Sequence, residues 1–170
     1  MANVRWGLLS TADINKDLIP AIRASERGEL VAVASRSQEA ATAYAKKWEI
    51  PTAFSSYQEM HDFDEIDAVY IGLPNHLHAE WTVKALQSGK HVLCEKPFAL
   101  TVDEVDAMIA TRNESGLVLA EAFMYRHHPQ TKLAHQWIRD GRLGDVSFIR
   151  AVHTYKMLLR DGNIRLAPEF

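Results

Sequence analysis

Short apolar runs alternate with helix-spaced apolar positions along most of the 170-residue chain. Nearly continuous apolar runs are typical of strands buried on both faces, and they lie at 4–9, 30–34, 53–54, 66–72, 91–94 and 117–122. Apolar positions at helical spacing, with cap or stop residues at several ends, predict helices over 14–22, 38–48, 57–61, 76–87, 102–115 and 129–139. This alternation predicts an α/β fold with a doubly wound, mostly parallel sheet. Its ligand crevice lies at the carboxyl ends of the strands.

Three local predictions extend this pattern. Asn75 stands where a side chain caps the helix that follows it. In the helix over 129–139, the spacing of Leu133, Trp137 and Ile138 turns these three side chains inward. Beyond that helix, apolar positions predict a longer strand over 146–155.

Charge and composition narrow the classes of function. The chain has 19 Lys and Arg against 22 Asp and Glu, a formal net charge of −3, which argues against a nucleic-acid partner. The single cysteine, Cys94, excludes an intrachain disulfide framework and a cysteine-built zinc site. No secretory signal follows Met1, and no apolar run approaches the ~18 residues of a spanning helix. We therefore expect a cytoplasmic protein without a membrane partner.

The turn after the first strand stands where a dinucleotide-binding fingerprint would lie. The fingerprint has glycines where this chain has Ser10 and Ala12, and a small residue where it has Asn15. Ser10 and Ala12 are small enough for backbone N–H groups to approach a pyrophosphate at the helix N-terminus, whereas Asn15 packs less well there. A plain strand–helix turn is the alternative.

The second strand ends in Ser35 and Arg36, without an acidic residue. A site that prefers NAD would carry Asp or Glu here to hold the ribose 2′-hydroxyl. A hydroxyl and a guanidinium instead suit a 2′-phosphate, because Arg binds phosphate through two parallel hydrogen bonds. If the first turn binds a dinucleotide, this pair favours NADP over NAD. An exposed Arg beside a helix cap is the alternative.

The strand over 66–72 leads into Pro74 and Asn75, which fix a tight turn whose backbone can meet the nicotinamide ribose. His76 and His78 follow. Their i, i+2 spacing on a helix points them apart, so we predict no metal site. We interpret this segment as a loop cap that brings His78 near the cofactor.

The strand over 91–94 leads into Glu95, Lys96 and Pro97. A lysine directly after a buried strand is costly unless it is used or paired, and Glu95 is the candidate partner. Lys96 lies at the predicted crevice, where a lysine can hydrogen-bond and polarise a substrate hydroxyl or carbonyl. A purely structural ion pair is the alternative. Cys94 is interpreted as a small buried side chain without reactivity.

Four segments, in this order and spacing, resemble the Gfo/Idh/MocA oxidoreductase family. They are Trp6-Gly7-Leu8-Leu9-Ser10-Thr11-Ala12, Leu73-Pro74-Asn75-His76-Leu77-His78, Glu95-Lys96-Pro97 and Glu121-Ala122-Phe123-Met124-Tyr125-Arg126-His127-His128-Pro129. The resemblance covers the N-terminal half of the family, a Rossmann domain. It is greatest to the branch with glucose–fructose oxidoreductase, NADP-dependent D-xylose dehydrogenase and dimeric dihydrodiol dehydrogenase.

The resemblance implies hydride transfer between NAD(P) and the hydroxyl-bearing carbon of a sugar, polyol or diol. It implies that Lys96 is the catalytic lysine, presented by a turn that often has a cis Lys–Pro bond. The positions that match cofactor contacts in the family are Ser10, Thr11, Ala12, Asp13, Ile14, Ser35, Arg36, Leu73, Pro74, Asn75, His78, Glu95, Lys96, Pro97 and Arg126. Lys96, Arg126 and His128 match substrate contacts.

The resemblance also implies a division into domains. Residues 1–144 match the dinucleotide-binding domain, and 145–170 match the first strand and loop of a second, α+β domain that is incomplete here. That second domain closes the substrate pocket in the family, so we expect little or no turnover from this piece alone. The strand over 146–155 is expected to be loosely ordered or to pair with a neighbouring copy. A non-catalytic dinucleotide-binding module or an inactive fragment is the alternative function.

Overall fold

A computed structural model describes residues 3–154 of the chain. The chain divides into two compact units, Met1–Ala122 and Phe123–Phe170, and each is described by itself. The elements of the first unit are β1 (Val4–Leu9), α1 (Asn15–Ala24), β2 (Gly28–Ala34), α2 (Gln38–Trp48), β3 (Thr52–Phe54), α3 (Tyr57–His61), β4 (Ala68–Ile71), the 3₁₀ turn η1 (Asn75–Leu77), α4 (His78–Gln87), β5 (His91–Cys94), α5 (Val102–Ser115) and β6 (Leu119–Glu121). The second unit contains the 3₁₀ turn η2 (Met124–His127) and α6 (Pro129–Arg139).

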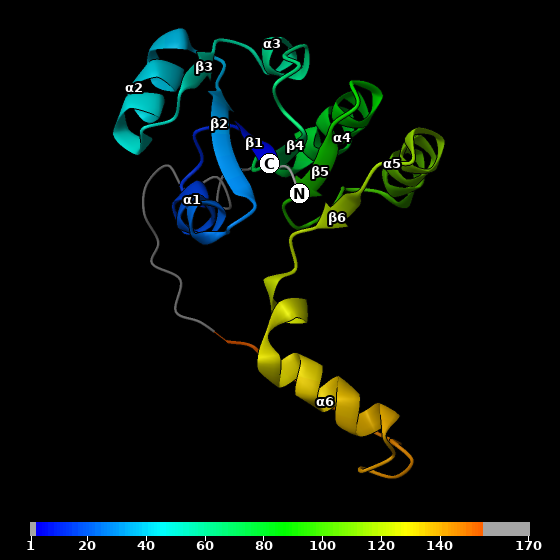
Figure 1. Ribbon diagram of the computed structural model, residues 1–170. Helices are drawn as coiled ribbons and strands as arrows, with labels where there is room; N and C mark the ends of the chain where they lie inside the picture. Colours follow the sequence, from blue (N-terminus) through cyan, green and yellow to red (C-terminus); the bar gives the residue numbers. More distant parts are fainter. Residues whose placement is uncertain (1–2, 155–170) are drawn as a thin grey trace. The chain divides into compact units, whose positions relative to one another are not determined.

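One parallel sheet runs through the first unit, with its strands in the order β3-β2-β1-β4-β5-β6 (Figure 1). The chain builds the sheet outward from β1 in one direction and then from β4 in the other. The order of the strands therefore reverses between β1 and β4, which is the topological switch point of a Rossmann fold. The predicted doubly wound α/β architecture is confirmed.

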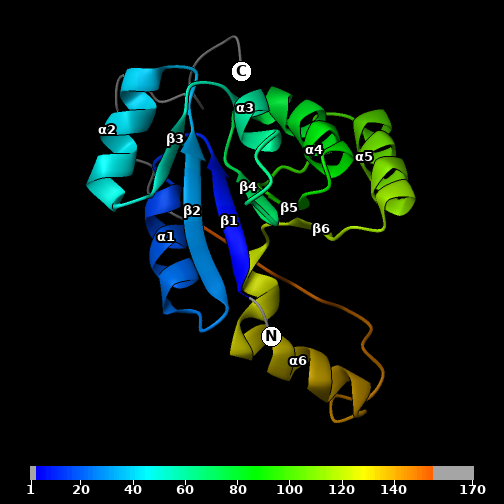
Figure 2. The same cartoon turned by 45° about the horizontal axis from the view of Figure 1, so that its top comes forward.

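Helices cover both faces of this sheet, as Figure 2 shows. On one face, Ile19 of α1 and Ala45 of α2 pack with Leu8 of β1 in one apolar cluster. On the other, Met60 of α3 and Leu86 of α4 belong to a second cluster. The strands are thus buried on both sides, which explains why their sequences are continuously apolar rather than alternating.

The predicted side-chain cap at Asn75 is wrong. Asn75 is the first residue of η1, and α4 begins only at His78. The amide of Leu77 donates to the carbonyl of Pro74 at 2.9 Å, and this tight 3₁₀ turn is inserted between strand and helix. The amide of His78, which a capping side chain would accept from, donates instead to the backbone carbonyl of Asn75.

The second unit differs from the prediction in two respects. Leu133, Trp137 and Ile138 of α6 are exposed, at 47%, 40% and 40%, so their predicted inward orientation is wrong. Residues 146–154 form no strand, because no described segment pairs with them and a strand needs a hydrogen-bonded neighbour; residue 155 lies outside the described residues. Pairing with another copy through this segment stays a prediction.

The boundary between the two compact units falls after Ala122, ahead of the boundary predicted at residue 144. Compactness does not identify the family's second domain, and the assignment of 145–170 to it stays a prediction. Over residues 3–154, none of the helices combines the length and the apolar character needed to cross a membrane.

Candidate functional site

The register of the sheet brings four loops to one edge. Leu9 pairs with Ala34 on one side and with Ile71 on the other, and Ile71 pairs with Cys94. These four residues end their strands, so the loops that follow begin at the same level of the carboxyl edge. The first residues of these loops are Ser10, Ser35, Gly72 and Glu95.

Ser10 adopts a backbone conformation that L residues seldom take, with a φ of 125°. Hydrogen bonds hold it there: its hydroxyl donates to the carbonyl of Gly72 at 2.9 Å and accepts from the amide of Ala12 at 3.3 Å. The fingerprint places glycine at this position. Here the bonds made by the Ser10 hydroxyl stabilise a conformation that glycine reaches without strain.

Asn15 fixes the same loop from the far end. Its side chain is fully buried, and its Nδ2 donates to the carbonyl of Ser10 at 2.8 Å. The side chain thus braces the loop through Nδ2, whereas its buried Oδ1 has no hydrogen-bond partner within the described residues. The loop from Ser10 to Ile14 leads directly into α1, whose N-terminal amides favour an anion.

Two substitutions at Ser10 test this account of the loop. Ser10→Ala keeps the strained φ and loses the hydroxyl bonds, whereas Ser10→Gly loses the bonds and relieves the strain. We expect Ser10→Ala to lower the free energy of unfolding by about 1–3 kcal/mol more than Ser10→Gly, as measured by urea denaturation. Equal losses in the two variants would contradict a glycine-like backbone at this position.

Ser35 and Arg36 follow β2 at the start of α2. The amide of Ser35 donates to the carbonyl of Phe54 at 3.1 Å, which holds the loop against β3. Arg36 is exposed, and within the described residues it has no hydrogen bond or ion pair. Ser37 caps α2 by accepting from the amide of Ala40. The Arg36 guanidinium is therefore free to bind an anion beside this helix.

Glu95 is the partner of Lys96, as the sequence predicts. The carboxylate of Glu95 lies 3.6 Å from Nζ of Lys96 and accepts from the Lys96 amide at 3.2 Å. The Glu95 side chain is 12% exposed and that of Lys96 42%. The ion pair thus has one buried anchor and one cation that reaches solvent. The peptide bond between Lys96 and Pro97 is cis.

Tyr70 is a member of this site that the sequence analysis missed. Its hydroxyl donates to Oε1 of Glu95 at 2.7 Å from a position that is 2% exposed. Burial raises the pKa of Tyr70, and the hydrogen bond to Glu95 raises it further, so the phenol keeps its proton. A tyrosine within a fully buried strand was the available signal, because a buried hydroxyl needs a partner.

Cys94, the residue before Glu95, takes no part in this chemistry. Burial raises the pKa of its thiol to about 12, which leaves almost no reactive thiolate near neutral pH. The interpretation of Cys94 as a small, inert core residue is confirmed.

His78 joins two of the loops instead of facing outward. Its ring is 1% exposed, with Nε2 at 2.8 Å from the carbonyl of Leu73 and Nδ1 at 2.8 Å from the carbonyl of Pro97. Both ring nitrogens are therefore occupied within the protein. A direct bond from this ring to a cofactor is not available in this arrangement, so any influence of His78 on a cofactor is indirect.

The other predicted contact residues of the first unit lie on the same loops. Leu73 is buried in the core, so only its backbone faces the edge, while Asn75 is exposed. Thr11, Ala12 and Ile14 are partly buried. Asp13, Pro74 and Pro97 complete the set: Asp13 and Pro97 are exposed and Pro74 is partly buried.

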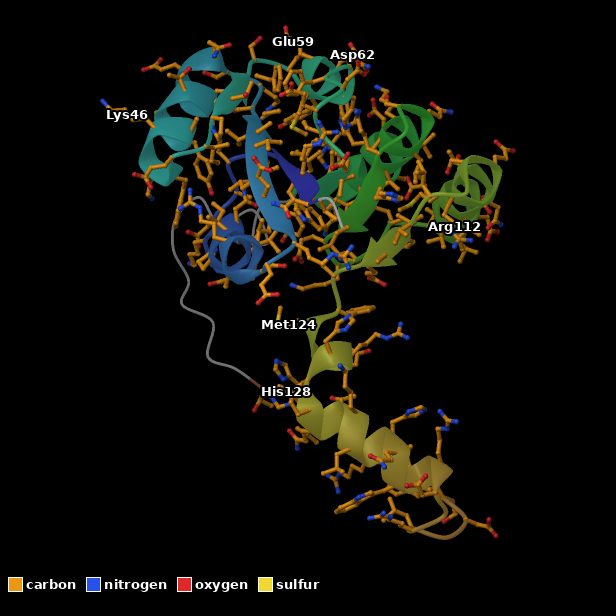
Figure 3. All side chains as sticks on the ribbon, in the orientation of Figure 1. Lys46, Glu59, Asp62, Arg112, Met124 and His128 are labelled. Carbon is orange, nitrogen blue, oxygen red and sulfur yellow. The ribbon has the colours of Figure 1, made fainter. Side chains whose placement is uncertain are left out.

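Arg126 and His128 belong to the second unit. Arg126 is an exposed residue of η2. His128 stands at the start of α6 (Figure 3), where its Nδ1 accepts from the amide of Gln130 at 3.2 Å and caps the helix. Their predicted contacts with cofactor and substrate stay predictions.

The comparisons with known proteins agree with this geometry. A family model described as "Oxidoreductase family, NAD-binding Rossmann fold" matches residues 4–123. The chain belongs to the Gfo/Idh/MocA oxidoreductase family. Among curated relatives in the family, it is 42% identical over 165 residues to the D-xylose 1-dehydrogenase (NADP(+)) 2 of Haloferax volcanii. It is 34% identical over 158 residues to a trans-1,2-dihydrobenzene-1,2-diol dehydrogenase of Xenopus tropicalis.

These matches cover 96% and 90% of this chain but 50% and 48% of the two relatives. The chain therefore spans about half the length of the curated Gfo/Idh/MocA proteins that it matches. Among solved structures, KijD10, a 3-ketoreductase from Actinomadura kijaniata in complex with TDP-benzene and NADP, superposes with a TM-score of 0.75 at 36% identity. That match covers 82% of this chain and 44% of KijD10.

Proposed function

We propose that this chain is the cofactor-binding half of an NADP-dependent oxidoreductase. The reaction is the transfer of a hydride between the nicotinamide ring and a hydroxyl-bearing carbon of a sugar, polyol or diol. One observation carries the proposal: the strand register aligns the loops after β1, β2, β4 and β5 at the switch-point edge, with Lys96 on the last of them. Family membership and the names of the relatives support the same reaction class.

The residues present fit the dinucleotide. The loop from Ser10 to Ile14 is held open by its own hydrogen bonds and ends at the N-terminus of α1, where a pyrophosphate is stabilised. Arg36, exposed and without an internal partner among the described residues, suits a 2′-phosphate. The D-xylose 1-dehydrogenase of Haloferax volcanii is named for NADP(+), and the superposed KijD10 structure holds NADP. We therefore assign NADP rather than NAD as the preferred cofactor.

When bound, the nicotinamide would supply the hydride chemistry, and Lys96 would control the oxygen of the reacting carbon. Its ammonium can donate a hydrogen bond to that oxygen and stabilise the charge that develops there. Glu95 holds the ammonium at 3.6 Å, and Tyr70 fixes the carboxylate from behind. Glu95 and Tyr70 thus hold Lys96 from the buried side, while its ammonium group reaches the crevice.

The partners we propose are small molecules. A net charge of −3 does not favour a nucleic-acid partner. A reducing compartment such as the cytoplasm fits a chain whose one cysteine is buried and unpaired.

Calorimetric titration of the chain with NADPH and with NADH tests the cofactor assignment. We expect NADPH to bind more tightly, and the absence of binding by either at millimolar concentration would overturn the proposal. The proposed hydride transfer is tested with a longer chain that spans both halves of the relatives and is assayed with a panel of sugars, polyols and diols. NADPH binding without oxidation or reduction of any of them would favour the alternative, a non-catalytic binding module.

A further inference from the structure

The His78 ring connects two loops that lie far apart in the sequence. Its Nε2 contacts the carbonyl of Leu73, at the end of β4, and its Nδ1 contacts the carbonyl of Pro97, beyond β5. Both distances are 2.8 Å, within the range of a normal hydrogen bond. A carbonyl oxygen only accepts, so both bonds form together only when each ring nitrogen carries a proton.

Burial makes this connection stiff. His78 is 1% exposed and is the first residue of α4. The packing of α4 against the sheet holds the backbone of His78 in place. A neighbour on the same helix, Thr82, is fully buried as well. A buried backbone carbonyl that loses its donor pays a desolvation cost, so both loops are stabilised in the positions that meet the ring.

The two loops carry different parts of the proposed site. Leu73 begins the turn through Pro74 and Asn75, which is predicted to meet the nicotinamide ribose, and Pro97 ends the turn that presents Lys96. Nothing in this pair of contacts involves the loop of Arg36, which lies on the other side of β1. The His78 bridge therefore connects loops on the nicotinamide side of the crevice and makes no contact with the loop on the 2′-phosphate side.

We propose that His78 is a positioning residue that sets the distance between the nicotinamide-side loop and the Lys96 turn. The proposal deepens the proposed function and rests on it. His78 touches neither cofactor nor substrate; it fixes two backbone segments so that the nicotinamide and Lys96 meet at a constant separation. Its loss should weaken binding of the nicotinamide half of the cofactor selectively.

The test compares two ligands on the same chain. NADPH engages both sides of the crevice, whereas 2′,5′-ADP carries the adenosine and the 2′-phosphate without the nicotinamide. In His78→Gln, one amide donor cannot reach two carbonyls at once, and we expect the Kd for NADPH to rise about 10-fold. The Kd for 2′,5′-ADP should stay within about 2-fold of the wild-type value. Thr82→Val, a buried change in the same helix that leaves the bridge intact, is the matched control and should leave both Kd values unchanged.

The outcomes separate the two proposals. If the wild-type chain binds neither ligand, the proposed cofactor function fails, whatever His78 does. If the wild type binds NADPH and His78→Gln loses affinity for both ligands equally, or for neither, the positioning role is overturned.

A second measurement needs no substitution. In the NMR spectrum of the wild-type chain, two ring N–H signals of His78 should be visible and should exchange slowly with water, because each ring nitrogen is buried against a carbonyl oxygen. A slowly exchanging proton on only one ring nitrogen, or on neither, would overturn the bridge even if the variant does not fold.

Discussion

Replacing Arg36 by Ala is expected to raise the Kd for NADPH about 10- to 100-fold while leaving the Kd for NADH within about 2-fold. Hydrogen bonds to a charged group contribute about 1.5–3 kcal/mol, and only NADPH offers a 2′-phosphate to the guanidinium. Arg36 is exposed and has no internal bond within the described residues, so its removal should not affect the fold. Calorimetric titration of the wild type and the variant with both cofactors measures the difference.

Arg112→Ala is the matched control for this experiment. Arg112 lies on α5 (Figure 3) and hydrogen-bonds Asn113 on the same helix. We expect this variant to bind both cofactors as the wild type does. If Arg36→Ala weakened the binding of NADPH and of NADH equally, the 2′-phosphate role would be contradicted. Arg36 would then contact a part of the molecule that both cofactors have.

His61 should make the fold less stable as the pH falls from about 6.5 to about 4. The ring is 1% exposed on α3, packs edge-on against Trp81 with centroids 5.5 Å apart, and has no hydrogen-bond partner at either nitrogen within the described residues. Burial lowers the pKa of His61 from 6.5 to about 4. The unfolded chain therefore binds the proton in this window while the folded chain does not.

The sign and size of the effect follow from that difference. The contribution of the neutral His61 ring to the free energy of unfolding is fully present above pH 6.5. As the pH falls from 6.5 to about 4, about 3 kcal/mol of this free energy is lost. Urea denaturation of the wild type and His61→Phe between pH 4 and pH 7 measures it, because the difference curve removes the groups that titrate in both proteins.

His135→Gln, a change at an exposed histidine of α6, is the control and should keep the wild-type slope. A His61→Phe curve parallel to that of the wild type would mean that the ring is protonated in the folded state.

Much of the fold could be predicted from the sequence because local and global signals agree. The apolar runs are continuous since both faces of the sheet are covered, and α5 begins at Val102, as the helix predicted over 102–115 does. Asn75 shows the limit of such signals. A residue suited to a cap was present, but Pro74 begins a 3₁₀ turn, and turn geometry decides where the helix starts.

The second unit was predicted less well, for a reason of packing. Amphipathic spacing states which face of α6 is apolar, but not whether another element covers it. Leu133 and Trp137 are exposed among the described residues. The strand expected from residue 146 onward likewise depends on a partner that no described segment supplies.

The candidate site was predicted at the level of its loops but not of its supports. Residue types and strand order placed Ser10, Arg36 and Lys96 on neighbouring loops. Contacts across the sheet, such as the hydrogen bond from Tyr70 to Glu95, depend on strand register and burial. The order of residues along the chain does not reveal either of these. His78 illustrates the same point, because its two carbonyl partners come from separate turns.

The central claim is that four loops at one edge of the sheet bind NADP. The most direct test is an ¹H–¹⁵N correlation spectrum of this chain, recorded while NADP⁺ is added. The account predicts that the largest shift changes fall on the amides of residues 10–14, 35–36, 72, 73, 75, 95, 96 and 98, while the amide signals of α5 do not move; Pro74 and Pro97 carry no N–H and give no signal. Shift changes spread elsewhere, or no change at millimolar NADP⁺, would contradict it.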